Sequence, residues 1–147
     1  MKEVHLVVGI CAIASWAVVA AFGAWSWRRA ASGPWFWRLL RVAQLVTIVH
    51  VALGGVLVAI GRKPPGLHVL YGLLPLAVSL IAESLRAASA QMVLDARGYE
   101  SAQAVGAEPP EEQRAVVVAI LRRELGLMTV AALVILVLLL RAAQTAG

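Results

Sequence analysis

Four long apolar runs dominate the pattern of hydrophobic and polar positions along the chain. A helix needs about 20 apolar residues to cross a bilayer, and each run is close to that length. The runs are roughly Val4–Trp27, Arg41–Ile60, Leu67–Ser84 and Leu125–Leu140. Polar stretches rich in proline and glycine separate them, so the pattern predicts four transmembrane helices.

The short connections predict an all-α, up-down four-helix bundle, an integral membrane fold that fills residues 1–147 as one domain. With their helical flanks, the predicted spans are residues 4–27, 39–61, 67–94 and 111–143, and a polar loop covers 98–110. The turn from Gly61 to Gly66 predicts an antiparallel hairpin of the second and third helices. The third and fourth helices are longer than the hydrocarbon core requires, so we expect both to extend into the cytoplasm.

Polar and small residues share one face of two of these helices. On the third helix they fall within an arc of roughly 80° at about 100° per residue. They are His68, Gly72, Pro75, Ser79, Glu83 and Arg86. On the second helix they are Gln44, Thr47, His50, Gly54 and Gly61. Because unpaired polar groups are costly in hydrocarbon, both faces are expected to pack inward.

Composition supports the membrane class. The chain is 61% hydrophobic and 14% charged, with a mean hydropathy of +0.84. Soluble domains are about half apolar and about a quarter charged. The single cysteine, Cys11, excludes an intramolecular disulfide. It lies inside the first apolar run, where we expect a small buried hydrophobe.

A net charge of +5 and a pI of about 10.4 suggest nucleic acid as a partner, but the positions of the charges do not. Basic residues cluster at the ends of the apolar runs, where they orient helices and contact lipid headgroups. Those beside the first and third loops are Arg28, Arg29, Arg38, Arg41, Arg86, Arg97, Arg114, Arg122 and Arg123, against Lys2, Arg62, Lys63 and Arg141 on the other side. We therefore predict a multi-pass protein of the plasma membrane, of the bacterial inner-membrane type. Loops 28–38 and 98–113 are expected in the cytoplasm and both termini outside.

Two groups of residues are candidates for chemistry. At the outer side, His5 and His68 open the first and third helices, and Arg62 and Lys63 lie close by. Two imidazoles at matched depth can hold a haem iron, and basic residues can pair with its propionates. The arrangement is loosely similar to small four-helix b-type cytochromes, which place two histidine pairs at matched depths. Here His50 is expected to lie deeper and to match neither partner well, which leaves one pair.

At the cytoplasmic side, Glu83 and Arg86 lie three residues apart, and Arg122 and Arg123 are expected at the same depth. A carboxylate within a membrane span is a candidate for proton or ion coupling. The favoured interpretation is an interfacial salt-bridge network that sets the register of the helices.

The sequence has no metal-ligand spacing, phosphate loop, nucleophile elbow or paired-carboxylate motif, so we predict no catalytic residue. The leading hypothesis is a non-catalytic subunit or ligand-binding module of a membrane system, for example a redox system. Its ligand would be haem b, quinone or lipid, and its setting a homo-oligomer or a larger membrane complex. The alternative is a small proton- or ion-coupled transporter or channel that uses Glu83. Four-helix multidrug transporters are similar in size, but they carry a carboxylate within the first helix, and this chain has none there after Glu3.

Overall fold

The computed structural model describes residues 1–31 and 33–146. Within these residues the chain forms helices joined by turns, and it contains no strand. The helices are α1 (Lys2–Arg29), α2 (Pro34–Ala59), α3 (Gly66–Ala87), α4 (Ser89–Ala96), α5 (Ala102–Gly106) and α6 (Pro110–Gln144). Four of them, α1, α2, α3 and α6, are long and apolar enough to cross a membrane. The expected all-α fold with four spans is confirmed.

Local sequence explains where the long helices begin and end. Proline occupies the first position of α2 and of α6, where its missing N–H costs no intrahelical bond. Helix α1 ends at Ala30, whose left-handed backbone (φ 50°) directs its N–H to the carbonyls of Ser26 and Trp27. After α2 the chain turns at Gly61, where φ is +89°, a value that favours glycine. The loop predicted at 28–38 is thus shorter, and its residue Ser32 lies outside the described residues.

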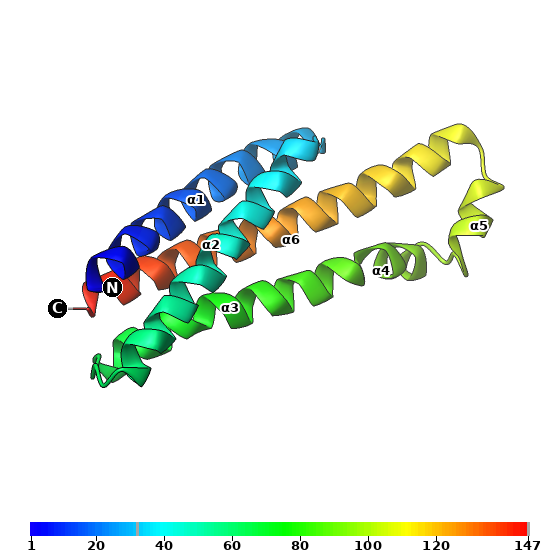
Figure 1. Cartoon of the computed structure of the whole chain (residues 1–147). Coiled ribbons are helices and arrows are strands. Elements are labelled where there is room, and N and C mark those ends of the chain that lie inside the picture. The colour runs from blue at the N-terminus through cyan, green and yellow to red at the C-terminus, as the bar shows by residue number, and fades with distance from the viewer. Residues whose placement is uncertain (32, 147) are drawn as a thin grey trace.

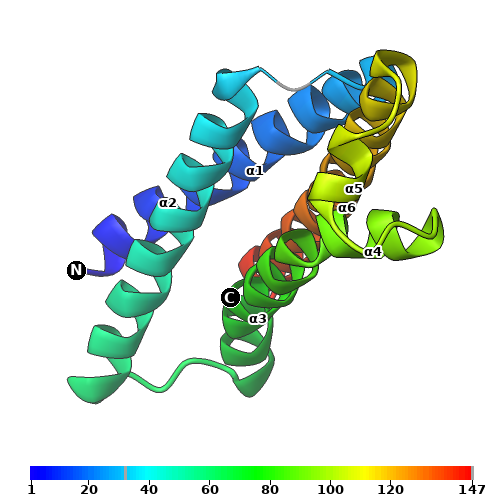
Figure 2. The same ribbon diagram turned by 90° about the vertical axis from the view of Figure 1, so that its right-hand side faces the viewer.

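The long helices are not arranged as a symmetric bundle. The start of α1, the end of α6 and the α2–α3 turn lie at one end of the molecule, and α5 with the first turns of α6 forms the other end, beyond the level where α1 and α2 meet (Figure 1). Helix α6 packs along both α1 and α3, and α1 packs along α2. Helices α2 and α3 touch only in part, because α2 leans away from the α3–α6 pair (Figure 2). Helices α2 and α3 are therefore joined by a short turn, as predicted, but α2 packs mainly against α1 and not against α3.

The main core lies between α1, α2 and α6. Its largest fully buried side chains are Trp16, Phe36, Leu40, Leu125, Met128 and Ile135. Two glycines allow close approach of α1 and α6: a Cβ at Gly23 would lie 2.6 Å from Thr129 Oγ1, and one at Gly126 would lie 2.8 Å from the Trp27 ring. Close packing at small residues is the main attraction between helices in lipid, where the hydrophobic effect no longer acts between them.

The third predicted span, 67–94, is interrupted. Helix α3 ends at Ala87, a turn follows at Ala88, and α4 begins at Ser89. The hydroxyls of Ser84 and Ser89 donate to the carbonyls of Leu80 (3.0 Å) and Leu85 (3.1 Å). Serine side chains that bond back to the preceding turn bend helices, which accounts for the break.

Beyond the break, α4, α5 and the first turns of α6 form a small extension with its own apolar cluster, Val93, Leu94, Val105 and Val116. Arg97 and Glu112 form an ion pair of 2.8 Å across it. Removal from water, with the carboxylates of Glu108 and Glu112 nearby, raises the pKa of the Tyr99 hydroxyl. The predicted loop 98–110 thus contains a helix, α5, which Ser101 caps by accepting from the N–H of Ala104 at 3.3 Å.

Cys11 differs from its expectation. Its side chain is exposed on the outer face of α1, whereas its neighbour Ala12 is fully buried in the core. Successive residues of a helix point about 100° apart, so Cys11 does not lie on the buried face that contains Ala12. The cysteine therefore faces the surroundings of the bundle.

Candidate functional site

Helices α1, α2 and α3 bring all three histidines of the chain together. The rings of His5 and His50 are stacked, with centroids 4.2 Å apart and planes 15° from parallel. The ring of His68 lies edge-on to His5, at 6.1 Å and 69°. His5 and His68 therefore meet as expected, but the expectation that His50 matches neither partner is wrong. Helix α2 continues beyond His50 to Ala59, and the stacking of the two rings places His50 level with His5.

Glycines explain how the rings of His5 and His50 can lie so close. His50 packs on Gly9 of α1, where a Cβ would lie 2.8 Å from its Cε1 atom. His5 packs on Gly54 of α2 in the reciprocal way, at 3.2 Å. Because Gly9 and Gly54 lack side chains, each imidazole fills the space on the opposite helix.

A sequence signal for this arrangement exists and was missed. Each histidine is followed four residues later by a glycine, in the pairs His5–Gly9, His50–Gly54 and His68–Gly72. Residues four apart lie on one helix face, so every histidine has a glycine one turn further along its own helix. The spacing is the same for all three histidines, whereas the expected depth in the membrane had separated His50 from His5 and His68.

The hydrogen bonds of the three imidazoles differ. His68 Nδ1 lies 2.9 Å from the backbone oxygen of Ala142 on α6. Since a carbonyl only accepts, Nδ1 must carry the proton, and the lone pair of Nε2 is left free. The Nδ1 atoms of His5 and His50 are buried and have no hydrogen-bond partner in the described part of the chain. Buried polar atoms are normally paired, so two unpaired atoms in one cluster need an explanation.

The cluster is not a ready three-ligand metal centre. Within residues 1–31 and 33–146, no group of three His, Cys, Asp or Glu residues is arranged to hold a metal ion. The predicted rim residues Arg62 and Lys63 are exposed on the α2–α3 turn, at the same end of the molecule as His68.

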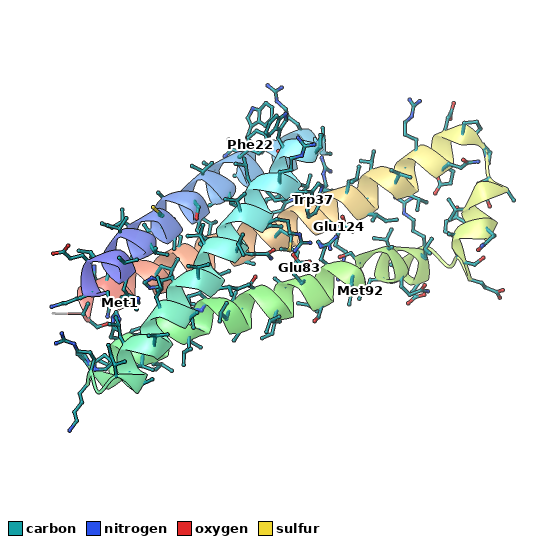
Figure 3. The ribbon with its side chains drawn as sticks, in the orientation of Figure 1. Met1, Phe22, Trp37, Glu83, Met92 and Glu124 are labelled. Carbon is teal, nitrogen blue, oxygen red and sulfur yellow. The ribbon has the colours of Figure 1, made fainter. Side chains whose placement is uncertain are left out.

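The second site joins α2 to α3 around Glu83, which Figure 3 labels. Its carboxylate accepts from both terminal nitrogens of Arg41, at 2.7 and 3.3 Å, and from Arg86 Nε at 2.9 Å. Gln44 Nε2 donates to the same carboxylate at 2.9 Å and to Ser79 Oγ at 3.1 Å. We call Arg41, Gln44, Ser79, Glu83 and Arg86 the Glu83 network. Arg41, Gln44, Ser79 and Glu83 also line a groove of about 180 Å³ between the two helices.

The expected partners of Glu83 are found only in part. Arg86 is present, but Arg123 donates to Met92 Sδ at 2.8 Å, and Arg122 borders a separate pocket beside Trp27. In the described residues, the ion-pair partners of Glu83 are Arg41 and Arg86, so neither Arg122 nor Arg123 joins this site. Sequence reasoning missed Arg41, Gln44 and Ser79 as partners. Gln44 and Ser79 did lie on the predicted polar faces, so a comparison of their depths would have paired them.

No family model matches this chain, nor does any curated protein or solved structure match it. Its function has to be argued from the geometry of these two sites.

Proposed function

We propose that this chain is a non-catalytic, ligand-binding membrane protein whose His5 and His68 hold the iron of a haem b. The observation that carries the proposal is the hydrogen bond from His68 Nδ1 to the Ala142 carbonyl. A histidine that ligates a metal commonly donates its other ring N–H to a backbone carbonyl, which fixes the tautomer and orients the ring. The free Nε2 of His68 is the nitrogen that such a ligand requires.

The spacing of the imidazoles supports the choice of pair. The His5 and His68 rings lie 6.1 Å apart, so these two imidazoles would hold the iron between them. The His5–His50 separation of 4.2 Å leaves no space for an ion, so His50 serves to support the ring of His5.

The surroundings suit an apolar group with an acidic edge. The cluster lies near one end of the spans, where a porphyrin can contact apolar helix faces and keep its propionates at the surface. Arg62 and Lys63 would pair with those propionates. Exposed apolar side chains along α2 and α3, such as Ile48 and Leu80, face lipid or a partner in a homo-oligomer or larger complex. We place both termini and the histidine cluster at the outer side of the plasma membrane. Arginines predominate at the opposite end of the spans, and arginine is enriched on the cytoplasmic side.

Absorption spectroscopy tests the proposal. The chain, expressed with haem supplied and purified in detergent, should show a Soret band and the sharp ferrous bands of low-spin, bis-histidine haem. His68→Ala and His5→Ala should each lose the low-spin spectrum, and His50→Ala should keep it with weaker haem retention. A wild-type protein without a Soret band contradicts the proposal.

The groove at Glu83 supports a second candidate, a small proton- or ion-coupled transporter. A half-buried carboxylate beside a cavity between two loosely packed helices is a plausible coupling site. Against it, the carboxylate already accepts from two arginines and a glutamine, as expected of a clasp that joins helices. Proton-driven efflux or ion flux in liposomes that Glu83→Gln abolishes would favour transport, and flux unchanged by Glu83→Gln would exclude this role for the carboxylate.

A further inference from the structure

A second cavity lies between the last turns of α1 and the middle of α6, away from both the histidines and Glu83. Its volume is about 460 Å³. It is lined by Ala24, Trp27, Arg28, Arg122, Thr129 and Leu133. The cavity thus combines two arginines and an indole with apolar side chains further along the helices.

In the part of the chain that the structure describes, neither arginine of this cavity has an acidic partner. The carboxylates that form ion pairs in the described residues belong to Glu83 and Glu112, and their partners are Arg41, Arg86 and Arg97. Two guanidinium groups, one from α1 and one from α6, therefore face one open cavity without neutralisation. Guanidinium groups bind phosphate oxygens through paired N–H donors, which makes a phosphate the matching ligand.

The dipole of α1 does not cancel this charge. The C-terminal end of a helix carries the equivalent of about −0.5 charge, against two full positive charges from Arg28 and Arg122. The backbone N–H of Ala30 also satisfies carbonyl oxygens of the last turn, those of Ser26 and Trp27. The charges of the two arginines therefore outweigh the helix dipole.

The residues that line the cavity indicate that the phosphate belongs to a lipid. The Trp27 indole lies against α6 at Gly126, where a Cβ would lie 3.0 Å from its Nε1 atom. The Thr129 hydroxyl is buried without a hydrogen-bond partner in the described residues. Leu133, half-exposed, continues the cavity along the apolar surface of α6. Tryptophan and arginine at the end of a span, with an apolar surface beyond them, match a headgroup joined to an acyl chain.

We propose that Arg28, Arg122 and Trp27 form a binding site for the phosphate of an anionic glycerophospholipid, with its acyl chain along Leu133. The two arginines hold the phosphodiester, Trp27 covers the glycerol region, and Thr129 supplies a hydroxyl at the floor. The bound lipid joins the end of α1 to α6. This site does not depend on the haem proposal, since it uses other residues at the opposite end of α1.

Native mass spectrometry of the detergent-purified chain tests the site, with phosphatidylglycerol, phosphatidylcholine or inorganic phosphate added. The wild type should retain phosphatidylglycerol roughly tenfold better than phosphatidylcholine, because the choline cation of phosphatidylcholine offsets the phosphate charge that the two arginines bind. The double variant Arg28→Gln/Arg122→Gln should lose this preference. Arg28→Lys/Arg122→Lys, which keeps the charge without the paired donors, should retain part of it.

The chain offers a matched control in the neighbouring residues. Arg29→Gln/Arg123→Gln removes the same charge at the same depth, but Arg29 lies over the Trp25 ring at 4.3 Å and Arg123 contacts Met92. This variant should keep the preference within about threefold, since the charge near the lipid surface changes only outside the cavity. The proposal would be overturned if both Gln variants lost the preference for phosphatidylglycerol to the same extent. It would also be overturned if the wild type showed no preference, and this second result does not depend on whether the variants fold. Displacement of the lipid by equimolar inorganic phosphate would also overturn it, because the site would then recognise free phosphate.

Discussion

The histidine cluster and the Glu83 network are both polar sites inside apolar helices, yet their hydrogen bonding is opposite. The Glu83 carboxylate accepts from three side chains, and Gln44 uses its amide to bond both Glu83 and Ser79. In the histidine cluster, the Nδ1 atoms of His5 and His50 have no partner in the described part of the chain. A satisfied network stabilises a contact between helices, whereas a buried polar atom without a partner costs free energy until it gains one.

The two sites also differ in what holds their helices together. At the histidines, α1 and α2 approach closely through Gly9 and Gly54. At Glu83, α2 and α3 have limited contact, and side chains bridge the distance. Close packing therefore dominates the α1–α2 contact, and charged and polar side chains dominate the α2–α3 contact.

The largest expected effect comes from removing the carboxylate of the Glu83 network. Glu83→Ala leaves Arg41, Arg86 and Gln44 without their common acceptor. We expect a loss of about 2–3 kcal/mol in the free energy of unfolding, less than for a fully buried pair because Arg41 is half-exposed. Denaturant unfolding in detergent micelles measures it. Glu111→Ala, an exposed carboxylate in the first turn of α6, is the control and should change little; equal losses would show that Glu83 is no clasp.

The second effect tests whether shape governs the α1–α2 contact. Gly9→Ala places a methyl group 2.8 Å from His50 Cε1, and the resulting overpacking should cost about 1–3 kcal/mol. Gly72→Ala is the matched control from the third histidine–glycine pair, where a Cβ meets open space. It should be neutral or slightly stabilising, since alanine favours a helix more than glycine does. The same unfolding assay should also show that His50→Ala relieves the cost of Gly9→Ala. Equal costs at Gly9 and Gly72 would contradict the reciprocal packing.

The smallest effect compares the hydrogen bonding of the two sites directly. His50→Phe replaces an imidazole whose buried Nδ1 has no partner in the described residues by an apolar ring, so the free energy of unfolding without ligand should stay within about 1 kcal/mol of wild type. Gln44→Leu removes a paired amide and leaves Ser79 and Glu83 short of a donor, which should cost about 1–2 kcal/mol. Thermal unfolding of both variants in one detergent ranks them. A larger loss for His50→Phe would show that His50 does have a polar partner.

Within the Glu83 network, the contact that was predicted lies on a single helix. Glu83 and Arg86 are three residues apart on α3, and their contact followed from helix geometry alone. Arg41 and Gln44 come from α2, and they reach Glu83 only because α2 crosses α3 at that level. A depth estimate that assumes straight, level helices misplaced His50, whose ring stacks on that of His5.

By itself, the sequence determined the four apolar spans, the helix ends at proline and glycine, and the polar faces of α2 and α3. These depend on periodicity and on contacts between residues at most a few turns apart. Only the tertiary structure decided that α6 lies between α1 and α3, that α2 leans toward α1, and that His50 stacks on His5. Those outcomes depend on how closely two helix backbones approach. Gly9, Gly54 and Gly126 set that distance through side chains on other helices, which no local pattern contains.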